Sequence, residues 1–296
     1  MLKRILITGA DGQVGSELKA HLGLDAEIIS LTRHNCDLAQ SDKLDGIIRS
    51  FKPTAIINAA AYTAVDRAES EPDLALLING TAPKILATVA KDLAIPFVNI
   101  STDYVFNGQN FTPYLETDPT NPVSVYGRTK LAGEQALVEV GGRYLNLRTA
   151  WVYGCQGKGN FVKTMLRVGE TREEIKVVAD QIGTPTWAKT IAVTIGELLP
   201  KLTDNHLESG TYHLTNSGVA SWYDLAVSVF DEAQKLGFPL IVKSVIPITT
   251  DEYPTPAARP AYSVLSNRKL TGVLNHPLPH WRKDLVTMLQ ELKSLK

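Results

Sequence analysis

Cysteine is scarce in this chain. Its only two cysteines are Cys36 and Cys155, and neither has a CxxC or Cys/His neighbourhood. Disulfide frameworks need many cysteines in a small secreted domain, and structural zinc sites need clustered Cys and His ligands. The cysteine content therefore predicts neither a disulfide scaffold nor a metal site.

Long apolar runs and basic segments are also missing. The apolar stretches are shorter than the roughly 20 residues that cross a bilayer. The stretch near the N-terminus stops at a glycine loop, which indicates a strand and not a signal peptide. With 30 Lys and Arg against 31 Asp and Glu, the net charge is −1, so bulk charge predicts neither nucleic acid nor an anionic membrane as a partner. We expect a cytoplasmic protein.

What is present is a chain of 296 residues with an ordinary 44% of hydrophobic residues. In its first half, apolar segments typical of buried strands alternate with segments at helical spacing. Strands are predicted at 4–9, 26–31, 55–60, 97–102 and 144–149, and helices at 14–22, 41–51, 73–94 and 124–140. Apolar strands separated by helices indicate a parallel sheet covered on both faces, and Pro83 predicts a kink or bulge in its helix.

After Thr149 the pattern loosens. Further elements are predicted as helices at 161–168, 190–202, 221–236 (with Ser221 as N-cap) and from about 281, and as strands at 175–178, 211–215 and 241–249. The predicted fold is α/β, a Rossmann-type doubly wound parallel sheet with a smaller C-terminal lobe. Residues 1–149 are expected to form a dinucleotide-binding domain and residues 150–296 mainly a substrate-binding lobe. The segment from about 171 to 218 is expected to return to the main sheet.

Three glycines, Gly9, Gly12 and Gly15, stand between the first strand and the first helix. Glycine permits a tight turn and a close backbone approach, and the N–H groups at a helix N-terminus can bind a pyrophosphate. The spacing is GxxGxxG and not the usual GxGxxG. The alternative is a glycine-rich turn needed only for packing, but the position favours dinucleotide binding.

The loop after the second strand should meet the ribose end of a dinucleotide. It has no acidic residue at the strand tip, where Arg33 stands instead, and Asp37 follows. A guanidinium can bind a 2′-phosphate, and this predicts a preference for NADPH with NADH still usable. Asp37 is expected nearer the adenine. The alternative for Arg33 is a solvated surface charge.

Tyr126 and Lys130 are four residues apart within a predicted helix, so both side chains can face one cleft. Thr102 ends the fourth strand, at the edge of an open α/β sheet where ligands bind. An ammonium near a phenol favours the phenolate, so Lys130 is expected to lower the pKa of Tyr126. Such a phenol is a good general acid for a carbonyl that is being reduced. The alternative is an ordinary helix surface.

Several segments together resemble the extended short-chain dehydrogenase/reductases, and within them the dTDP-4-dehydrorhamnose reductases. The segments are "TGADGQVG" (8–15), "NAAAYTAVDRAE" (58–69), "STDYVFNG" (101–108), "YGRTK" (126–130), "RTAWVYG" (148–154), "DQIGTPTWA" (180–188) and "ARPAYSVLSNRKL" (258–270). The glycine loop and the Tyr/Lys pair specify only the superfamily. The other segments point to the rhamnose branch, and the resemblance covers nearly the whole chain.

The resemblance implies reduction of the C4 keto group of dTDP-6-deoxy-L-lyxo-4-hexulose to dTDP-L-rhamnose. Tyr126 would protonate the C4 oxygen, Lys130 would bind the nicotinamide ribose, and Thr102 would polarise the carbonyl. The implied contacts to NADPH or NADH are Gly9, Asp11, Gly12, Gln13, Val14, Gly15, Arg33, Asp37, Leu38, Ala59, Ala60, Ala61, Tyr62, Tyr126 and Lys130. A bound Mg²⁺ and a homodimer are allowed by resemblance only.

The substrate contacts are expected from Thr63, Thr102, Asp103, Tyr104, Trp151 and Arg259. Arg259 lies in a proline-rich loop and could hold a diphosphate, although a plain surface arginine is the alternative. Trp151 could pack on the sugar or base, or be a core residue. Asn160 and Phe161 are weaker candidates for a nucleotide cap.

Two other functions share these motifs. A related enzyme with different chemistry is one, but a dehydratase would be expected to carry an Asp-Glu pair where this chain has Asp103 and Tyr104. A regulatory subunit without catalysis, similar to that of methionine adenosyltransferase, is the other. The Thr102, Tyr126 and Lys130 set favours an enzyme.

Overall fold

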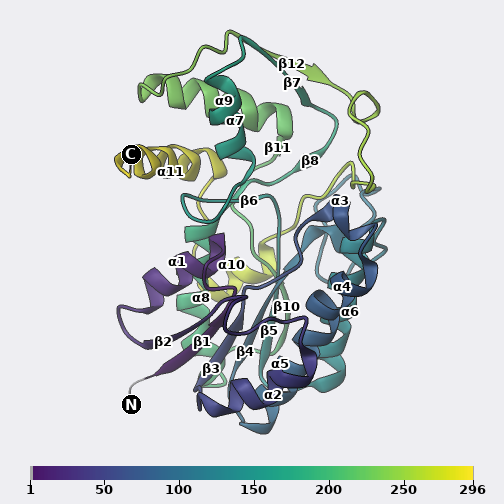
Figure 1. Ribbon diagram of the computed structural model, residues 1–296, viewed down its shortest axis with the longest axis vertical. Helices are drawn as coiled ribbons and strands as arrows, with labels where there is room; N and C mark the ends of the chain where they lie inside the picture. Colours follow the sequence, from purple (N-terminus) through teal and green to yellow (C-terminus); the bar gives the residue numbers. More distant parts are fainter. Residues whose placement is uncertain (1–2, 296) are drawn as a thin grey trace.

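The computed structural model describes residues 3–295, so residues 1, 2 and 296 of the predicted ranges lie outside it. At its centre is a parallel sheet with the strand order β10-β5-β4-β3-β1-β2 (Figure 1). The strands are β1 (Arg4–Thr8), β2 (Glu27–Leu31), β3 (Ala55–Asn58), β4 (Phe97–Thr102), β5 (Tyr144–Thr149) and β10 (Gly210–His213). The predicted parallel sheet is confirmed.

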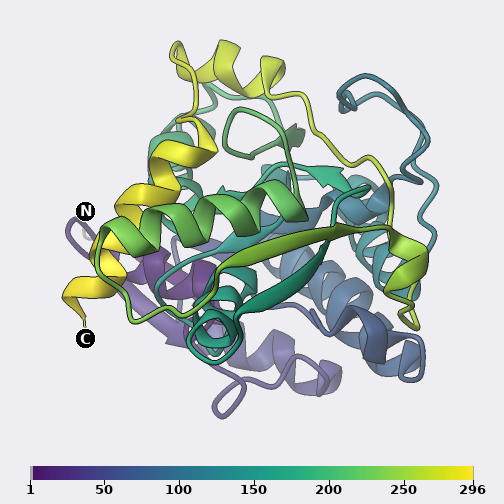
Figure 2. The same ribbon diagram turned by 90° about the horizontal axis from the view of Figure 1, so that it is seen from above.

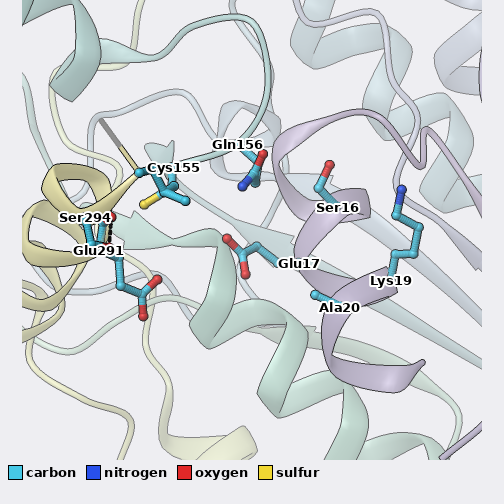
Figure 3. A pocket seen from close by; sticks show the side chains of 9 residues that line it. Ser16, Glu17, Lys19, Ala20, Cys155, Gln156, Glu291 and Ser294 are labelled. Carbon is cyan, nitrogen blue, oxygen red and sulfur yellow. Dashed lines mark hydrogen bonds between the residues drawn. The ribbon is translucent and has the colours of Figure 1, made fainter. Parts of the chain in front are cut away.

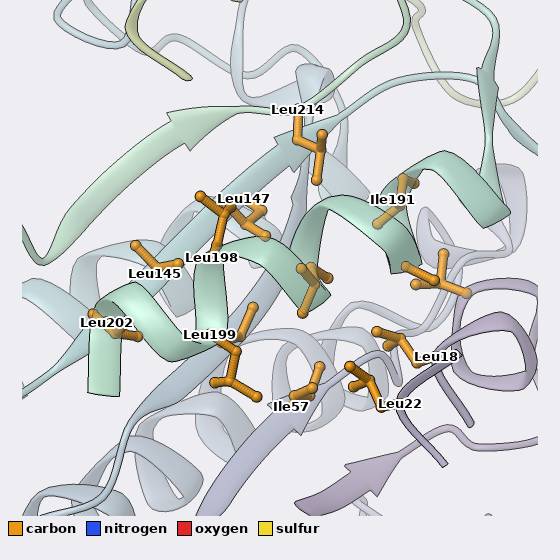
Figure 4. Close-up of a cluster of buried hydrophobic side chains, with 14 of the residues drawn as sticks. Leu18, Leu22, Ile57, Leu145, Leu147, Ile191, Leu198, Leu199, Leu202 and Leu214 are labelled. Atoms are coloured by element: carbon orange, nitrogen blue, oxygen red, sulfur yellow. The ribbon is translucent and has the colours of Figure 1, made fainter. Parts of the chain in front are cut away.

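Helices cover both faces of this sheet. One face carries α1 (Gln13–Leu22), α8 (Ala188–Thr203) and α10 (Arg268–Leu274); the other carries α2 (Ser41–Ser50), α5 (Ala82–Asp92) and α6 (Val125–Val140). Figure 4 shows the first layer, where leucines of α1 and α8 meet strand residues such as Leu145 and Leu147. The fold is therefore the predicted doubly wound α/β type.

The strand sequences explain why both faces are covered. Within β1, Ile5 and Ile7 pack in the core on the α1 and α8 side, whereas Leu6 packs on the α2 and α5 side. Successive side chains of a strand point to opposite faces. An unbroken apolar strand therefore needs a helical layer on each side.

The helix predicted at 73–94 is interrupted before Pro83. It comprises α4 (Pro72–Leu76), a π-helical turn (Leu77–Thr81) and α5. Proline has no N–H to bond the carbonyl four residues earlier, here that of Asn79, and its ring crowds that carbonyl. The predicted bulge is confirmed. Helix α6 packs closely against this turn at Gly133. A Cβ at Gly133 would lie only 2.3 Å from the Asn79 oxygen, so the contact needs a glycine.

A second layer of structure lies beyond the carboxyl ends of the strands (Figures 1 and 2). Its elements are β6 (Val152–Tyr153), α7 (Phe161–Gly169), β7 (Glu174–Val178), β8 (Ile182–Gly183), β9 (Thr186–Trp187), β11 (Ala220–Ser221), α9 (Trp222–Lys235), β12 (Ser244–Ile248) and α11 (Trp281–Ser294). We call these elements the upper lobe. Its own apolar core is formed by α7, α9 and α11 with β7.

The capping prediction for this lobe is confirmed, because the Ser221 hydroxyl accepts the Asp224 N–H and the Asp224 carboxylate accepts the Ser221 N–H. The strand predicted at 241–249 is shorter, since only Ser244–Ile248 pairs with β7. The chain also returns to the main sheet, where β10 pairs with β5 and α8 packs on α1. Within residues 3–295 no helix is long and apolar enough to cross a membrane.

Candidate active site

The predicted site residues follow strands that end at one edge of the sheet. Thr8 of β1 is in register with Asn58 of β3, and Thr102 of β4 is in register with Thr149 of β5. The glycine loop follows β1 and the Ala59–Ala61 segment follows β3. Parallel strands bring these segments together at the sheet's carboxyl edge, which is where ligands bind in open α/β folds.

The glycine loop lies directly against the segment after β3. Gly9 has a φ of +64°, and a Cβ there would lie 2.8 Å from the Ala60 backbone. A Cβ at Gly15 would lie 2.1 Å from the Gly9 oxygen. Helix α1 begins at Gln13 with no side-chain cap and no acidic residue in its first turn. Its N–H groups are therefore available to an anion, and the loop fits a dinucleotide pyrophosphate.

The other predicted cofactor residues at the start of α1 differ in how far they are buried and in what they contact. Asp11 is exposed and Val14 is buried. The Gln13 side chain bonds to the upper lobe, where its oxygen accepts from Asn160 at 2.8 Å and its nitrogen donates to the Val152 carbonyl at 3.4 Å. Asn160 also caps α7 by accepting the Lys163 N–H. Asn160 thus joins α7 to the glycine loop.

The loop after β2 leaves Arg33 highly exposed, with a side-chain exposure of 77%. Its Nε lies 3.6 Å from the Asp37 carboxylate, one turn away in sequence. Asp37 also accepts the Ala39 N–H at 3.0 Å, while Leu38 is buried. The guanidinium is free to meet a phosphate or solvent, so both interpretations of Arg33 stay open.

Thr102, Tyr126 and Lys130 come together. The Ser124 hydroxyl caps α6 by accepting the Gly127 N–H at 3.1 Å, which places Tyr126 in the first turn. The Tyr126 phenol interacts with the Thr102 hydroxyl. The Lys130 ammonium is buried and donates to the Ile100 carbonyl of β4 at 2.6 Å.

The expected pKa of the phenol is wrong in this structure. The pKa of Tyr126 is raised to about 12, mainly by burial and to a smaller extent by the Asp103 charge, against the opposing effect of the Thr102 hydroxyl. Burial also lowers the pKa of Lys130 to about 8, against the opposing charge of Glu134. The ammonium is directed to the Ile100 carbonyl, so desolvation of the phenol prevails.

A buried ion pair behind Lys130 was missed by the sequence analysis. Glu134, one turn along α6, accepts from Arg148 of β5 at 2.7 Å and from the Ser101 hydroxyl. Both charged side chains are almost fully buried, with exposures of 6% for Arg148 and 5% for Glu134. The Lys-to-Glu spacing of four residues was the available signal. The partner on β5 could be found only from the fold.

Arg259 has specific partners and is not a plain surface arginine. It donates to the Asp66 carboxylate at 2.9 Å and to the Ala257 carbonyl at 3.0 Å. Its charge also acts on Tyr104, which follows the catalytic candidate Thr102. Asp66 lies in α3 (Val65–Ala68), so this ion pair joins the proline-rich loop to the segment after β3.

The remaining residues of that segment are held by α4 and the π-helical turn. The Tyr62 hydroxyl donates to Glu71 at 2.6 Å, and its backbone N–H donates to the Asn79 side chain at 2.8 Å. Thr63 is exposed, and Ala59, Ala60 and Ala61 are half-buried. This wall of the site is therefore braced, but part of it remains open to solvent.

Trp151 is not a fully buried core residue. It is half-buried, has a φ of +48°, and stacks on Trp222 with 3.6 Å between ring centroids. A Cβ at Gly183 would lie 2.6 Å from the Trp151 ring, so only glycine fits there. Phe161 lies against the other tryptophan, 4.7 Å from the Trp222 ring. Trp222 gave no signal in the sequence, because it begins an amphipathic helix like any core residue.

A separate hollow lies between α1 and α11 (Figure 3). It has a volume of about 440 Å³, and its lining includes Glu17, Cys155, Gln156 and Glu291 but none of the predicted catalytic residues. Within residues 3–295 no group of three or more His, Cys, Asp or Glu side chains is placed to hold a metal ion. We assign no step to a metal.

Comparisons with known proteins agree with this geometry. The family model of the RmlD substrate binding domain matches residues 3–294. A dTDP-4-dehydrorhamnose reductase of Burkholderia thailandensis is 43% identical over 98% of this chain and 99% of its own length. A crystal structure of a dTDP-4-dehydrorhamnose reductase from Clostridium acetobutylicum is 39% identical, with a TM-score of 0.90 over 98% of this chain and 99% of that one.

A second crystal structure, of dTDP-4-dehydrorhamnose reductase from Bacillus anthracis in complex with NADP, is 36% identical with a TM-score of 0.90. The match covers 98% of this chain and 100% of that chain. The family model and these relatives both extend over nearly the whole sequence. The chain therefore belongs to the RmlD substrate binding domain family.

Proposed function

We propose that this protein is an NADPH-dependent oxidoreductase that reduces the C4 keto group of dTDP-6-deoxy-L-lyxo-4-hexulose to give dTDP-L-rhamnose. The observation that carries the proposal is the meeting of Thr102, Tyr126 and Lys130 beside the glycine loop at the carboxyl edge of the sheet. The near full-length relatives named as dTDP-4-dehydrorhamnose reductases support the substrate. The NADP complex of one such relative supports the cofactor.

The nicotinamide cofactor supplies the hydride. Tyr126 gives its proton to the carbonyl oxygen, and its raised pKa keeps the phenol protonated at neutral pH, as a general acid must be. The Lys130 ammonium is positioned between β4 and α6, where it can hold the cofactor's ribose and offset negative charge on the phenolate. The cytoplasmic location is part of this proposal.

The nucleotide part of the substrate lies toward the upper lobe. The Arg259 guanidinium is held in place by the Ala257 carbonyl and the Asp66 carboxylate. A guanidinium held in this way suits a diphosphate better than a mobile side chain would. The Trp151 ring, supported by Trp222, offers a flat apolar surface to the sugar or base. Binding energy from these remote groups would orient the reacting carbonyl.

The test is the oxidation of NADPH, followed by its absorbance, with enzymatically generated dTDP-6-deoxy-L-lyxo-4-hexulose. Tyr126→Phe keeps the ring and removes the proton donor, so kcat should fall by about 10²- to 10⁴-fold. Binding of NADPH, measured by fluorescence titration, should remain, which shows that the variant is folded. Near-normal kcat in Tyr126→Phe contradicts the assignment. Dinucleotide binding without any turnover by the wild type favours a regulatory subunit.

A further inference from the structure

The Thr102 hydroxyl has a crowded set of hydrogen bonds. It donates to Oδ1 of Asp103 at 3.0 Å and accepts the Tyr104 N–H at 3.2 Å. A hydroxyl has one hydrogen and two lone pairs. In this arrangement its one hydrogen is committed to Asp103. None is then left for Tyr126, whose pKa a hydroxyl that donated to the phenolate would lower. The resemblance implied that Thr102 polarises the substrate carbonyl. In this arrangement it cannot do so, because it has no hydrogen left to donate.

Asp103 is built into the protein in an unusual way for a carboxylate. It is 2% exposed, and its Oδ2 is buried without a hydrogen-bond partner among the described residues. Buried carboxylates are normally paired with a cation, because an unpaired buried charge is costly. Here the interacting groups are the hydroxyls of Thr102 and Ser263 and two backbone N–H groups. These hydrogen bonds favour the ionised carboxylate, but burial favours the neutral carboxyl more strongly and prevails.

We propose that Asp103 is a positioning residue that sets the direction of the Thr102 hydroxyl, and that its neutral form is the one competent for reduction. A neutral Asp103 carboxyl donates to Thr102. The Thr102 hydrogen is then released to point toward Tyr126 and the reacting carbonyl oxygen. This inference rests on the proposed function and names a residue that acts mainly through Thr102, beside the direct effect of its charge on Tyr126.

The change in direction helps the reaction at one point. When Tyr126 has given up its proton, the phenolate needs a hydrogen-bond donor, and the redirected Thr102 hydroxyl provides one. With an ionised Asp103, the phenolate instead faces a lone pair of Thr102 and a nearby negative charge, which raises its energy. The ionised form should therefore reduce the ketone more slowly.

The groups that face Asp103 come from three elements. Tyr126 of α6 and Tyr104 interact with its charge, and Ser263 contacts it from the C-terminal segment. The Arg259 charge acts on Tyr104. Burial raises the pKa of Asp103 to about 6, while the pKa of each phenol is raised far above neutral pH. Asp103 is thus the group in this cluster that titrates near pH 6, below the pKa of about 8 of Lys130.

The test measures the single-turnover rate of hydride transfer from NADPH to the keto sugar between pH 5.5 and 8. The rate at which NADPH decomposes in acid without the sugar is measured separately and subtracted. For one group with a pKa of about 6, the wild-type rate should fall about 25-fold between pH 5.5 and 7.5, as its neutral fraction falls. Asp103→Asn is similar in shape and cannot titrate, so its rate should lack this limb. Thr102→Val removes the hydroxyl that transmits most of the effect, so its limb should be much smaller than that of the wild type.

Two variants serve as matched controls. Thr102→Ser retains a hydroxyl and should keep the limb at reduced rate. Asp92→Asn removes an exposed carboxylate on α5 and should keep both rate and limb. If Asp103→Asn does not fold, the Thr102→Val and Thr102→Ser pair decides. Three results overturn this inference: a limb near pH 6 that persists in Asp103→Asn, a limb of wild-type size in Thr102→Val, or an active wild type without the limb. A wild type inactive at every pH overturns the proposed function instead.

Discussion

His213 should make the folded state sensitive to mild acid. It lies at the end of β10, in register with Arg148 of β5, and is fully buried. Burial lowers the pKa of its ring to about 3, the Arg148 charge adds to this, and the backbone carbonyls of Ser266 and Tyr114 oppose it. The charge of Lys269 acts in the same direction as Arg148. The native ring is therefore neutral, with its edge toward Phe106.

The sign and the magnitude follow from proton linkage. In the unfolded chain the ring titrates near its ordinary pKa of 6.5, whereas in the folded protein it stays neutral down to about 3. The unfolded state thus binds one more proton as the pH falls below 6.5, and the stability present above that value is lost. With these pKa values the loss between pH 7 and pH 5 is about 2 kcal/mol, and between pH 7 and pH 4 about 3 kcal/mol.

The assay is urea unfolding followed by tryptophan fluorescence at pH 7, 5 and 4. His213→Gln is neutral at every pH, so its disadvantage at pH 7 should shrink relative to wild type by about 2 kcal/mol at pH 5. The raised pKa of Asp103 acts in the opposite direction, but it is present in both proteins and cancels in the difference. His206→Gln, at an exposed position, is the matched control.

A difference in unfolding free energy between wild type and His213→Gln that is equal at pH 7 and pH 5 would refute this reasoning. If Gln does not pack at this site, His213→Leu provides the same comparison without a buried polar group. A control variant that changes the pH dependence as much as His213→Gln would show that the effect does not come from the buried ring.

The other predictions concern cofactor and substrate. Lys130→Met should weaken NADPH binding and remove any fall in kcat/KM above about pH 8, where the wild-type ammonium loses its proton; an unchanged pH–rate profile and KM would reduce Lys130 to a structural role. Arg33→Ala should raise KM for NADPH by about tenfold and leave that for NADH nearly unchanged, and equal effects on both would exclude it as the phosphate partner. Gly9→Ala should destabilise the fold by about 1–2 kcal/mol in thermal unfolding, because its φ is +64°, whereas an unaltered midpoint would contradict the close packing. Trp222→Leu should raise KM for the nucleotide sugar about three- to tenfold with kcat kept, through loss of the support for Trp151; a lowered kcat at unchanged KM would speak against it.

Local features were predictable because short-range geometry decides them. Unbroken apolar segments predicted the strands of the parallel sheet, and the Ser221 cap and the bulge before Pro83 follow from backbone hydrogen bonding within one or two turns. The four-residue spacing of Tyr126 and Lys130 likewise requires only that a helix forms. These sequence signals predict the glycine loop and Tyr126, the expected proton donor, at the same edge of the sheet.

The tertiary structure decided which distant groups meet and what their burial does. Arg259 and Asp66 are 193 residues apart in the chain and form an ion pair. Trp151, which follows β5, stacks on Trp222 at the start of α9. No local pattern encodes such pairs, because they depend on how the layers pack. Burial also overturned the expected direction of the Tyr126 pKa shift, and desolvation depends on all the surrounding elements at once. The sequence by itself predicted the strands and main helices of the central sheet and the candidate reactive groups. The packing of the layers determined the partners of these groups, the direction of their pKa shifts and the short elements of the upper lobe.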